Sequence, residues 1–352
     1  AQDVAATLER ARTSARYAQR LEDVTGVAAR NDAVMIRLSR PLSTLPCRLD
    51  IPVVKSGTES RAVPVGSGPY LTASTLWWQD AAVPLTEIRL QHCKDRDSAL
   101  YAFSSREIQL LVLDLTASDG TGVSGSGDYT EVPTPVMQFI GMNTRRTALE
   151  DPALRRALSA GIDRATLVSS CLLGQGTAAQ LPASPAYSGY DTALETAYSA
   201  AAYTRALNEA LGEPRENEKP RTLTLLVNQE NSFKVTAAEE VAFSLSNQRL
   251  TVTVDAVPWD TFPSRLQDGN FDLYYGECRL TADWDVSALL GWEGSLNYGG
   301  WGDEETERLL SLCRTAEGDS RNAALRQLWE HLLDTAPFAP VCFKSLSVLT
   351  TE

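Results

Sequence analysis

The feature that most constrains the fold is an alternation of strand and helix patterns that begins near residue 221. Short apolar runs typical of buried strands are separated by longer stretches with helical spacing. The predicted order is strand Leu223–Val227, helix Val235–Leu245, strand Leu250–Val254, helix Trp259–Gln267 and strand Phe271–Tyr275. Because helical crossovers connect parallel strands, this order predicts an α/β fold with a mostly parallel sheet covered by helices.

Further segments surround this unit. The spacing predicts helices at 3–21, after the capping residues Asp151, Asp163 and Asp303, and at 320–334. Alternating or apolar runs predict strands at 34–38, Tyr70–Trp78, Ile88–His92, Ile108–Leu113 and 339–349. A Gly/Ser-rich stretch at 117–128 lacks the Gly-Lys-Ser/Thr of a phosphate loop and is expected to be a surface loop.

Composition excludes several classes of function. The chain has 352 residues and a formal net charge of −13, which argues against binding to nucleic acid or to an anionic membrane. No apolar run reaches the roughly 20 residues of a membrane span. The six cysteines form no CxxC pair, and most lie in apolar surroundings, so buried free thiols are expected.

Catalytic and cofactor motifs are absent. The two histidines, His92 and His331, fall in different predicted elements without metal-ligand spacing. The chain has no Gly-x-Ser-x-Gly elbow, no His-Glu-x-x-His and no dinucleotide fingerprint. We therefore expect a non-enzymatic protein with no cofactor and no metal.

The segment Gly276–Asp285 directly follows the last predicted parallel strand. Ligands of open α/β sheets bind beyond the carboxyl ends of strands, so a site is expected here. Asp283 can pair with a ligand ammonium group, Trp284 can supply an apolar wall, and Arg279 can bind a carboxylate in a bidentate manner. The alternative is an internal Asp–Arg pair that closes the loop.

Several stretches resemble the family 5 extracellular solute-binding proteins of ABC importers, the peptide, dipeptide and nickel group. The resemblance lies in Ala1–Leu8, in Gly66–Tyr70, in Phe139–Thr144 with the stretch Asp151–Arg164, and in Phe271–Asp285 with Asn297–Gly300. It implies a two-lobed periplasmic-binding-protein-like fold (type II, cluster C) with mixed sheets and a partial small domain.

The resemblance also implies a function. It indicates a bacterial extracytoplasmic protein, a lipoprotein in many relatives, that captures a small solute, most simply a short peptide, and delivers it to ABC permease subunits as a monomer. Contact with the membrane is expected only through a lipid anchor outside this chain.

The family motif assigns the ammonium anchor to Asp283 and the aromatic position to Trp284. Asp285, Tyr298 and Asn143 complete the expected ligand set, although Asn143 also suits a structural role at a strand end.

The chain departs from the family pattern at two places near this motif. Val286 replaces a proline, and Arg279-Leu280 replace the usual Gly-Trp. Arg279 could bind a ligand carboxylate, or it could neutralise Asp283 or Asp285.

Compared with the family, the chain is expected to be truncated at both ends. Residues 1–65 are then the remnant of a small α+β domain, 66–146 with 338–352 form lobe I, and 147–337 form lobe III. Two other functions remain open: the same fold as a ligand-sensing module of a regulator, and a peptide hydrolase.

Overall fold

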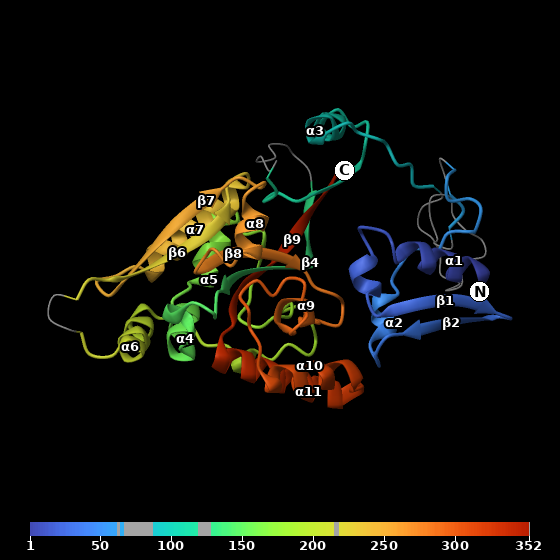
Figure 1. The fold of residues 1–352 in the computed structure, drawn as a ribbon. Coiled ribbons are helices and arrows are strands. Elements are labelled where there is room, and N and C mark those ends of the chain that lie inside the picture. Colours follow the sequence, from blue (N-terminus) through green and yellow to red (C-terminus); the bar gives the residue numbers. More distant parts are fainter. Residues whose placement is uncertain (62–63, 67–86, 119–127, 215–217, 352) are drawn as a thin grey trace. The chain divides into compact units, whose positions relative to one another are not determined.

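The computed structural model describes residues 1–61, 64–66, 87–118, 128–214 and 218–351 (Figure 1). The chain divides into two compact units. Unit 1 comprises Ala1–Lys94, Thr281–Asp283 and Arg314–Glu317, and unit 2 comprises Asp95–Leu280, Trp284–Cys313 and Gly318–Glu352. The expected boundary between lobes I and III falls inside unit 2 and stays a prediction.

Unit 1 is a helix packed on a two-stranded antiparallel sheet. Its elements are α1 (Gln2–Ala11), a 3-10 turn (Ala18–Leu21), β1 (Val24–Arg30), β2 (Ala33–Leu38) and α2 (Leu45–Arg48). Leu8 and Ala11 of α1 pack with Leu21, Val24 and Ile51 in its apolar cluster. The strand predicted at 34–38 is confirmed.

The helix predicted over 3–21 is wrong in length, because α1 ends at Ala11. Beyond it, the Thr13 hydroxyl donates to the Arg10 carbonyl, and the Ser14 hydroxyl accepts from the Arg16 amide. Short hydroxyl side chains that bond nearby backbone compete with helical hydrogen bonds. The helical spacing of apolar residues extends beyond Ala11, but the hydroxyl groups of Thr13 and Ser14 bond the backbone there and the helix ends.

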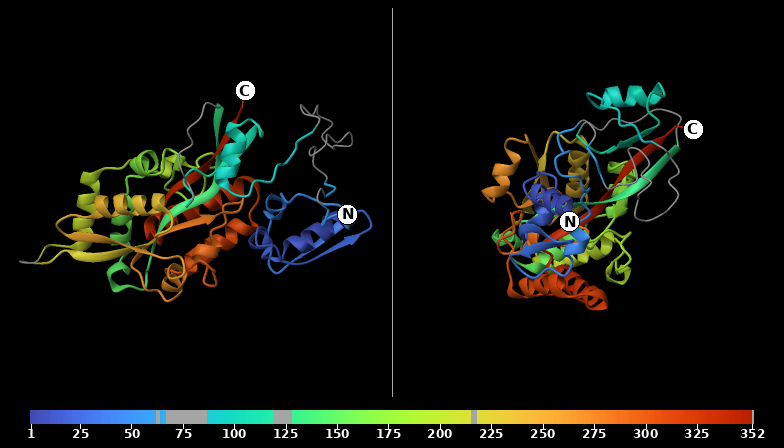
Figure 2. Two further views of the ribbon diagram at one scale, coloured as in Figure 1. Left: turned by 90° about the horizontal axis from the view of Figure 1, so that it is seen from above. Right: turned by 90° about the vertical axis from the view of Figure 1, so that its right-hand side faces the viewer.

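Unit 2 is built on a seven-stranded mixed sheet in the order β3-β9-β4-β8-β6-β7, with β5 paired to β9. The strands are β3 (Leu110–Leu113), β4 (Asp128–Met142), β5 (Gly176–Ala178), β6 (Arg221–Asn228), β7 (Leu250–Val257), β8 (Leu273–Arg279) and β9 (Phe338–Thr350). The predicted parallel order is confirmed, since β6 pairs in parallel with both β7 and β8. The long strands β4 and β9 run antiparallel side by side (Figure 2).

Helices of unit 2 pack against this sheet and against one another. They are α3 (Arg96–Ser104), α4 (Pro152–Ala160), α5 (Arg164–Thr166), α6 (Ala200–Leu211), α7 (Ser232–Leu245), α8 (Phe262–Gln267), α9 (Ser287–Leu290), α10 (Glu304–Thr315) and α11 (Gly318–Thr335). A π-helical turn, Leu167–Cys171, follows α5, and short 3-10 turns lie at Thr147–Leu149 and Thr192–Leu194.

The expected caps are present at three helix starts. The Asp151 carboxylate accepts the Ala153 amide at 2.8 Å, and the Asp163 carboxylate accepts the Thr166 amide at 3.1 Å. Asp303 accepts the Thr306 amide at 2.8 Å. Each side-chain oxygen satisfies an amide that has no partner within its own helix.

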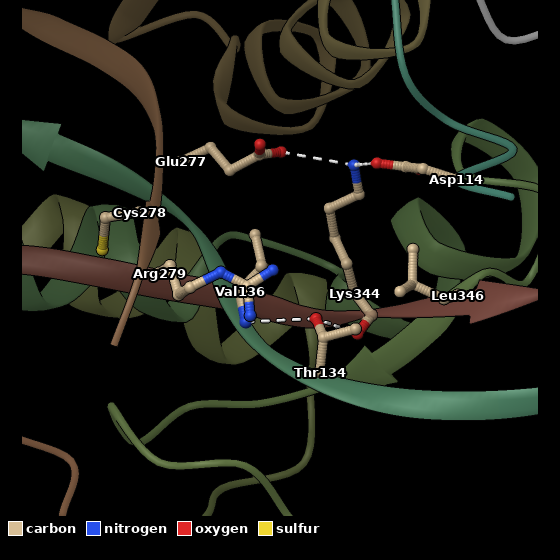
Figure 3. A pocket seen from close by; sticks show the side chains of 8 residues that line it. All are labelled: Asp114, Thr134, Val136, Glu277, Cys278, Arg279, Lys344 and Leu346. Carbon is tan, nitrogen blue, oxygen red and sulfur yellow. Dashed lines mark hydrogen bonds and ion pairs between the residues drawn. The ribbon is translucent and has the colours of Figure 1, made fainter. Parts of the chain in front are cut away.

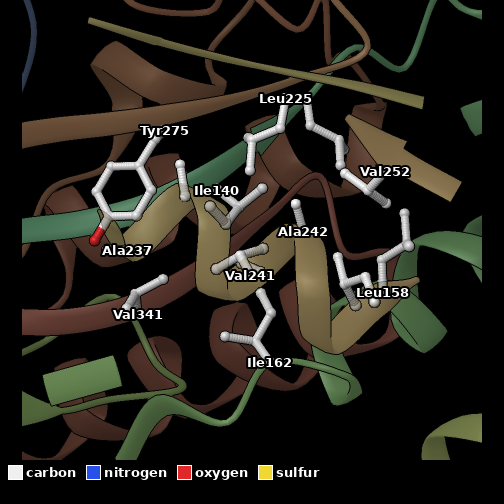
Figure 4. Close-up of a cluster of buried hydrophobic side chains, with 14 of the residues drawn as sticks. Ile140, Leu158, Ile162, Leu225, Ala237, Val241, Ala242, Val252, Tyr275 and Val341 are labelled. Atoms are coloured by element: carbon white, nitrogen blue, oxygen red, sulfur yellow. The ribbon is translucent and has the colours of Figure 1, made fainter. Parts of the chain in front are cut away.

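The core of unit 2 surrounds α7 (Figure 4). Val241 and Ala242 of α7 lie between sheet residues such as Leu225 and the side chain of Ile162, which follows α4. These side chains are almost fully buried. The core holds β6, β7 and β8 in place and so fixes the strand end where a site was expected.

One predicted strand is wrong and one lies outside the described residues. Residues 88–92 form no strand, because Leu90 is 81% exposed and its apolar face has no core to join. The strand predicted at Tyr70–Trp78 and most of the Gly/Ser-rich stretch lie outside the described residues. The helices α3 and α6 were not predicted from the sequence.

Candidate ligand-binding site

The expected site begins on β8, which is longer than predicted and extends to Arg279. Its first four residues, Leu273–Gly276, are buried, and its last three pair in antiparallel register with Val136–Gln138 of β4. The Leu280 amide then donates to the Pro135 carbonyl at 2.9 Å. Two continuous strands thus hold the backbone of residues 277–280.

A pocket of about 280 Å³ opens beside this strand end (Figure 3). Its walls come from β4, β8 and β9 and from the chain after β3. The lining residues are Asp114, Thr134, Val136, Glu277, Cys278, Arg279, Lys344 and Leu346. Four of these eight side chains carry a charge, so the pocket is a charged one rather than an apolar one.

Lys344 is the central cation of the pocket. Its side chain is only 5% exposed, and its Nζ lies 2.6 Å from Asp114 Oδ2 and 3.5 Å from Glu277 Oε2. Glu277 is also contacted by Lys234 Nζ of α7 at 3.3 Å and accepts the Gln138 amide at 2.9 Å. A buried ammonium is tolerated because carboxylates compensate its charge.

These contacts set the ionisation of the pocket. Burial alone would raise the pKa of Glu277, but the ammonium groups of Lys234 and Lys344 and the Gln138 amide outweigh burial and hold it below its ordinary value. Burial raises the pKa of the neighbouring Cys278 thiol to about 12. Glu277 is therefore an anion at neutral pH, and Cys278 is a protonated thiol rather than a nucleophile.

Arg279 differs from the other charged residues of the pocket. It is exposed, and within the described part of the chain its guanidinium has no hydrogen-bond or ion-pair partner. Both carboxylates of the pocket already have lysine partners. The four charges of the lining sum to zero, but Lys234 of α7 adds a further cation at Glu277, so Arg279 is the lining cation that no carboxylate of the pocket pairs with.

Asp283 lies in unit 1 and is already paired there. Its Oδ2 lies 2.9 Å from Nη2 and 3.0 Å from Nε of Arg48, and it accepts the Thr44 hydroxyl at 2.5 Å. The two side chains of this pair are 1% and 3% exposed. An aspartate–arginine pair thus forms, as the alternative interpretation of the segment anticipated, but its arginine is Arg48 and not Arg279.

Trp284 has an unusual backbone conformation. Its φ is 56°, in the left-handed region that side-chain-bearing residues seldom adopt. The indole lies against Tyr187 and Phe343, with ring centroids 5.7 and 5.6 Å away. Its buried Nε1 has no hydrogen-bond partner among the described residues. Trp284 is therefore a buried ring that packs against two other aromatic rings and keeps an unused donor.

The remaining predicted residues have local structural contacts. Asp285 accepts the backbone amide and the hydroxyl of Ser287 at the start of α9. The Asn143 amide donates to the carbonyls of Gly269 and Phe271, each at 3.0 Å. Tyr298 packs edge-on against Tyr274. Of the six predicted site residues, only Arg279 lines the pocket.

Sequence reasoning missed Lys344, Asp114 and Arg48. A lone charged residue, Lys344, in the mostly apolar run Val341–Leu346 was a usable signal, because a buried lysine in such a strand needs an acidic partner. No local pattern marks Arg48 as the partner of a residue 235 positions away.

The described residues were also searched by their chemistry for metal ligands, paired histidines and reactive cysteines. The described residues contain no cluster of three or more His, Cys, Asp or Glu side chains that could hold a metal ion. His331 contacts Asp303 and Thr306 at the start of α10. All six cysteines are free thiols, three of them buried. A membrane-spanning helix, which needs a long and mostly apolar stretch, is not found in the part of the chain that the structure describes.

The chain is similar to a family of bacterial binding proteins. Residues 1–299 match the "Bacterial extracellular solute-binding proteins, family 5 Middle". Two curated relatives from Bacillus subtilis are the oligopeptide-binding proteins AppA, 21% identical over 57% of this chain, and OppA, 20% identical over 76%. The chain spans 40% of the first relative and 51% of the second, about half their length.

Solved structures share the fold. The structure of AppA from Bacillus subtilis with a nonapeptide is 17% identical and has a TM-score of 0.65, covering 100% of this chain and 79% of the other. A nickel ABC transporter structure from Bacillus halodurans is 18% identical and has a TM-score of 0.78, with the same coverage. The predicted fold class, that of two-lobed α/β binding proteins, is confirmed. The chain belongs to the bacterial extracellular solute-binding proteins of family 5.

Proposed function

We propose that this chain captures a small solute, most simply a short peptide, as the extracytoplasmic binding component of an ABC importer. The curated relatives are oligopeptide-binding proteins. The observation that supports capture most directly is the charged pocket beside the end of β8, where a ligand of an α/β sheet is expected. Permease subunits as partners, a lipid anchor and a monomeric state belong to the same proposal.

The six residues predicted from the sequence are also the proposed ligand contacts. Their proposed roles take into account the contacts that each side chain makes in the structure. Arg279 binds a carboxylate at the pocket, and Trp284 supplies an aromatic wall. Asp283 meets a ligand ammonium group beside Arg48, where the two cations share one carboxylate. Tyr298, Asp285 and Asn143 support the surrounding loops and complete the set.

The proposal predicts binding without turnover. Cys278 is held as a thiol, and the segment holds no histidine beside it that could act as a base. A ligand that binds only the folded chain stabilises it by about 2.7 kcal/mol when present at roughly 100 times its Kd. The stabilisation should therefore be visible as a rise in the melting temperature.

The test has two readouts from one preparation. Small molecules released by denaturing the purified chain are identified by mass spectrometry, and melting is followed with defined pools of tri-, tetra- and pentapeptides. We expect peptides among the released molecules, a rise in melting temperature, and full recovery of the added peptides after long incubation. Cleaved peptides would indicate a hydrolase, and a chain that neither carries nor responds to peptides would refute peptide capture.

A further inference from the structure

We propose that a small cavity in unit 2, between α4 and α11, binds a monatomic anion, in practice chloride. Its walls come from these two helices, from the chain after β5 and from the turn that leads into β9. The cavity has a volume of about 20 Å³, and its lining is apolar apart from Ser159, Gln180 and Trp329. A cavity of this size holds a single water-sized particle, so a polyatomic ligand such as sulfate is excluded.

The first observation behind this proposal is an indole donor on the cavity wall. Trp329 is 1% exposed, and its Nε1 has no hydrogen-bond partner among the described residues. An indole N–H can only donate. A buried donor without an acceptor lowers the stability of a protein, so such donors are rare and each one calls for an explanation. An acceptor inside the cavity satisfies this one.

The second observation is a buried cation behind the same wall. Arg164 is 8% exposed, and its guanidinium donates only to neutral oxygens. Two of these acceptors belong to lining residues, the Pro340 carbonyl at 2.7 Å from Nε and the Ser159 hydroxyl at 3.0 Å from Nη2. Burial lowers the pKa of Arg164 to about 10, which still leaves it a cation at neutral pH. A buried charge is costly unless an opposite charge compensates it.

The one carboxylate that acts on Arg164 is engaged elsewhere. Glu195 raises the pKa of Arg164 through its charge but makes no hydrogen bond to it. The Glu195 carboxylate instead accepts the Tyr190 hydroxyl, and it accepts the Gln180 amide at 3.4 Å. The compensation that Glu195 gives is therefore indirect, and an anion in the cavity adds the charge that the guanidinium lacks.

The polar groups of the wall favour an anion over a water molecule. The Ser159 hydroxyl accepts from Arg164, so its own proton is left to donate, as is that of Trp329 Nε1. Bound water needs acceptors for its two protons as well as donors. A halide ion only accepts, and two donors with a cation behind them suit it.

The acceptors of the wall are already engaged. The side-chain amide of Gln180 donates to the Thr196 carbonyl at 2.6 Å and accepts the Thr196 amide at 3.1 Å. The carbonyls of Ala336 and Pro340 accept bonds from arginine side chains at 3.2 and 2.7 Å. The protons of a water molecule thus meet oxygens that are in use, whereas a halide ion needs none of them.

The experiment compares thermal unfolding in sodium chloride and in sodium gluconate at equal concentration. Gluconate is too large for the cavity, so it shows the general effect of salt. The variants Trp329→Phe and Ser159→Ala each remove one donor, and Trp284→Phe is the control. Trp284 is a suitable control because it is also a buried indole with an unpartnered Nε1, but it does not line this cavity.

We expect chloride to raise the melting temperature of the wild-type chain above that in gluconate, by about 2 °C at ten times its Kd. Each donor variant should raise the chloride concentration that gives half of the full shift by about ten- to a hundredfold, as for loss of a hydrogen bond to a charged group. The control Trp284→Phe should keep the wild-type response to chloride.

Diffraction from crystals of the wild-type chain in sodium bromide gives a readout that needs no variant, because bromide scatters anomalously. A peak in the cavity, within reach of Trp329 Nε1 and Ser159 Oγ, supports the anion site. The inference is overturned if the wild-type chain melts alike in chloride and gluconate, if Trp329→Phe keeps the wild-type response, or if the cavity shows no bromide peak. Where a donor variant fails to fold, the bromide peak decides.

Discussion

Two buried ionic clusters in this chain use the same kinds of side chain to different ends. In unit 1, Asp283 and Arg48 form a closed pair with exposures of 3% and 1%. In unit 2, Lys344 is equally buried, but its partners Asp114 and Glu277 remain 31% and 26% exposed at a pocket. A closed pair is expected to act mainly on stability, whereas a partly open cluster with an unpaired cation is suited to binding.

The largest loss of stability is expected from removing one partner of the closed pair between Asp283 and Arg48. Arg48→Met leaves the buried Asp283 carboxylate without its guanidinium, and loss of one partner of a buried pair costs about 3–5 kcal/mol. Hydrogen exchange of the β1 and β2 amides measures the local free energy of opening in unit 1. Arg20→Met, which removes a more exposed pair with Asp50, serves as the control and should cost about 1 kcal/mol or less. Equal losses for the two variants would contradict the distinction.

A smaller loss is expected from the open cluster. Lys344→Met leaves Asp114 and Glu277 facing each other, but both are partly solvated and Glu277 keeps Lys234. We expect a loss of about 2 kcal/mol in urea unfolding, below the range for fully buried pairs. Lys234→Met should cost less, because Lys344 then still compensates Glu277. A loss for Lys344→Met as large as that for Arg48→Met would show that the pocket is effectively closed.

Two threonines allow a matched comparison of single hydrogen bonds. The Thr44 hydroxyl donates to the Asp283 carboxylate at 2.5 Å, whereas the Thr134 hydroxyl donates to the Lys344 carbonyl at 2.7 Å. Bonds to charged groups contribute about 1.5–3 kcal/mol and neutral ones about 1 kcal/mol. Thr44→Val should therefore lower the free energy of unfolding more than Thr134→Val, each measured by hydrogen exchange in its own unit. A larger loss for Thr134→Val than for Thr44→Val would contradict the expectation that the bond to the Asp283 carboxylate is the stronger of the two.

The smallest expected effect is the change in stability with pH that Glu277 causes. The pKa of Glu277 in the folded chain lies below its ordinary value of 4.5, so its contribution to stability is fully present above about pH 4.5 and is lost as the pH falls through the lowered pKa. Urea unfolding between pH 6 and pH 3 should thus show a steeper loss for the wild-type chain than for Glu277→Gln. Parallel curves would mean that the two lysines do not hold Glu277 ionised.

Some of the fold and part of the site were predictable from local sequence. Asp151, Asp163 and Asp303 marked helix starts, and the alternation after residue 221 marked three parallel strands, because caps and apolar periodicity act between residues close in the chain. The helix predicted to reach residue 21 and the strand predicted at 88–92 were wrong, since neither pattern shows whether a core lies opposite.

The sequence by itself determined the α/β class, the family and the strand end at which charged residues gather. Only the tertiary structure decided which charges compensate one another. Arg48 reaches Asp283 across 235 positions, and Lys344 reaches Asp114 across 230. Such pairs depend on the packing of distant elements, and Coulomb energy depends on separation and burial rather than on order along the chain. That is why Asp283 stood out in the sequence, whereas the structure leaves the available charge on Arg279.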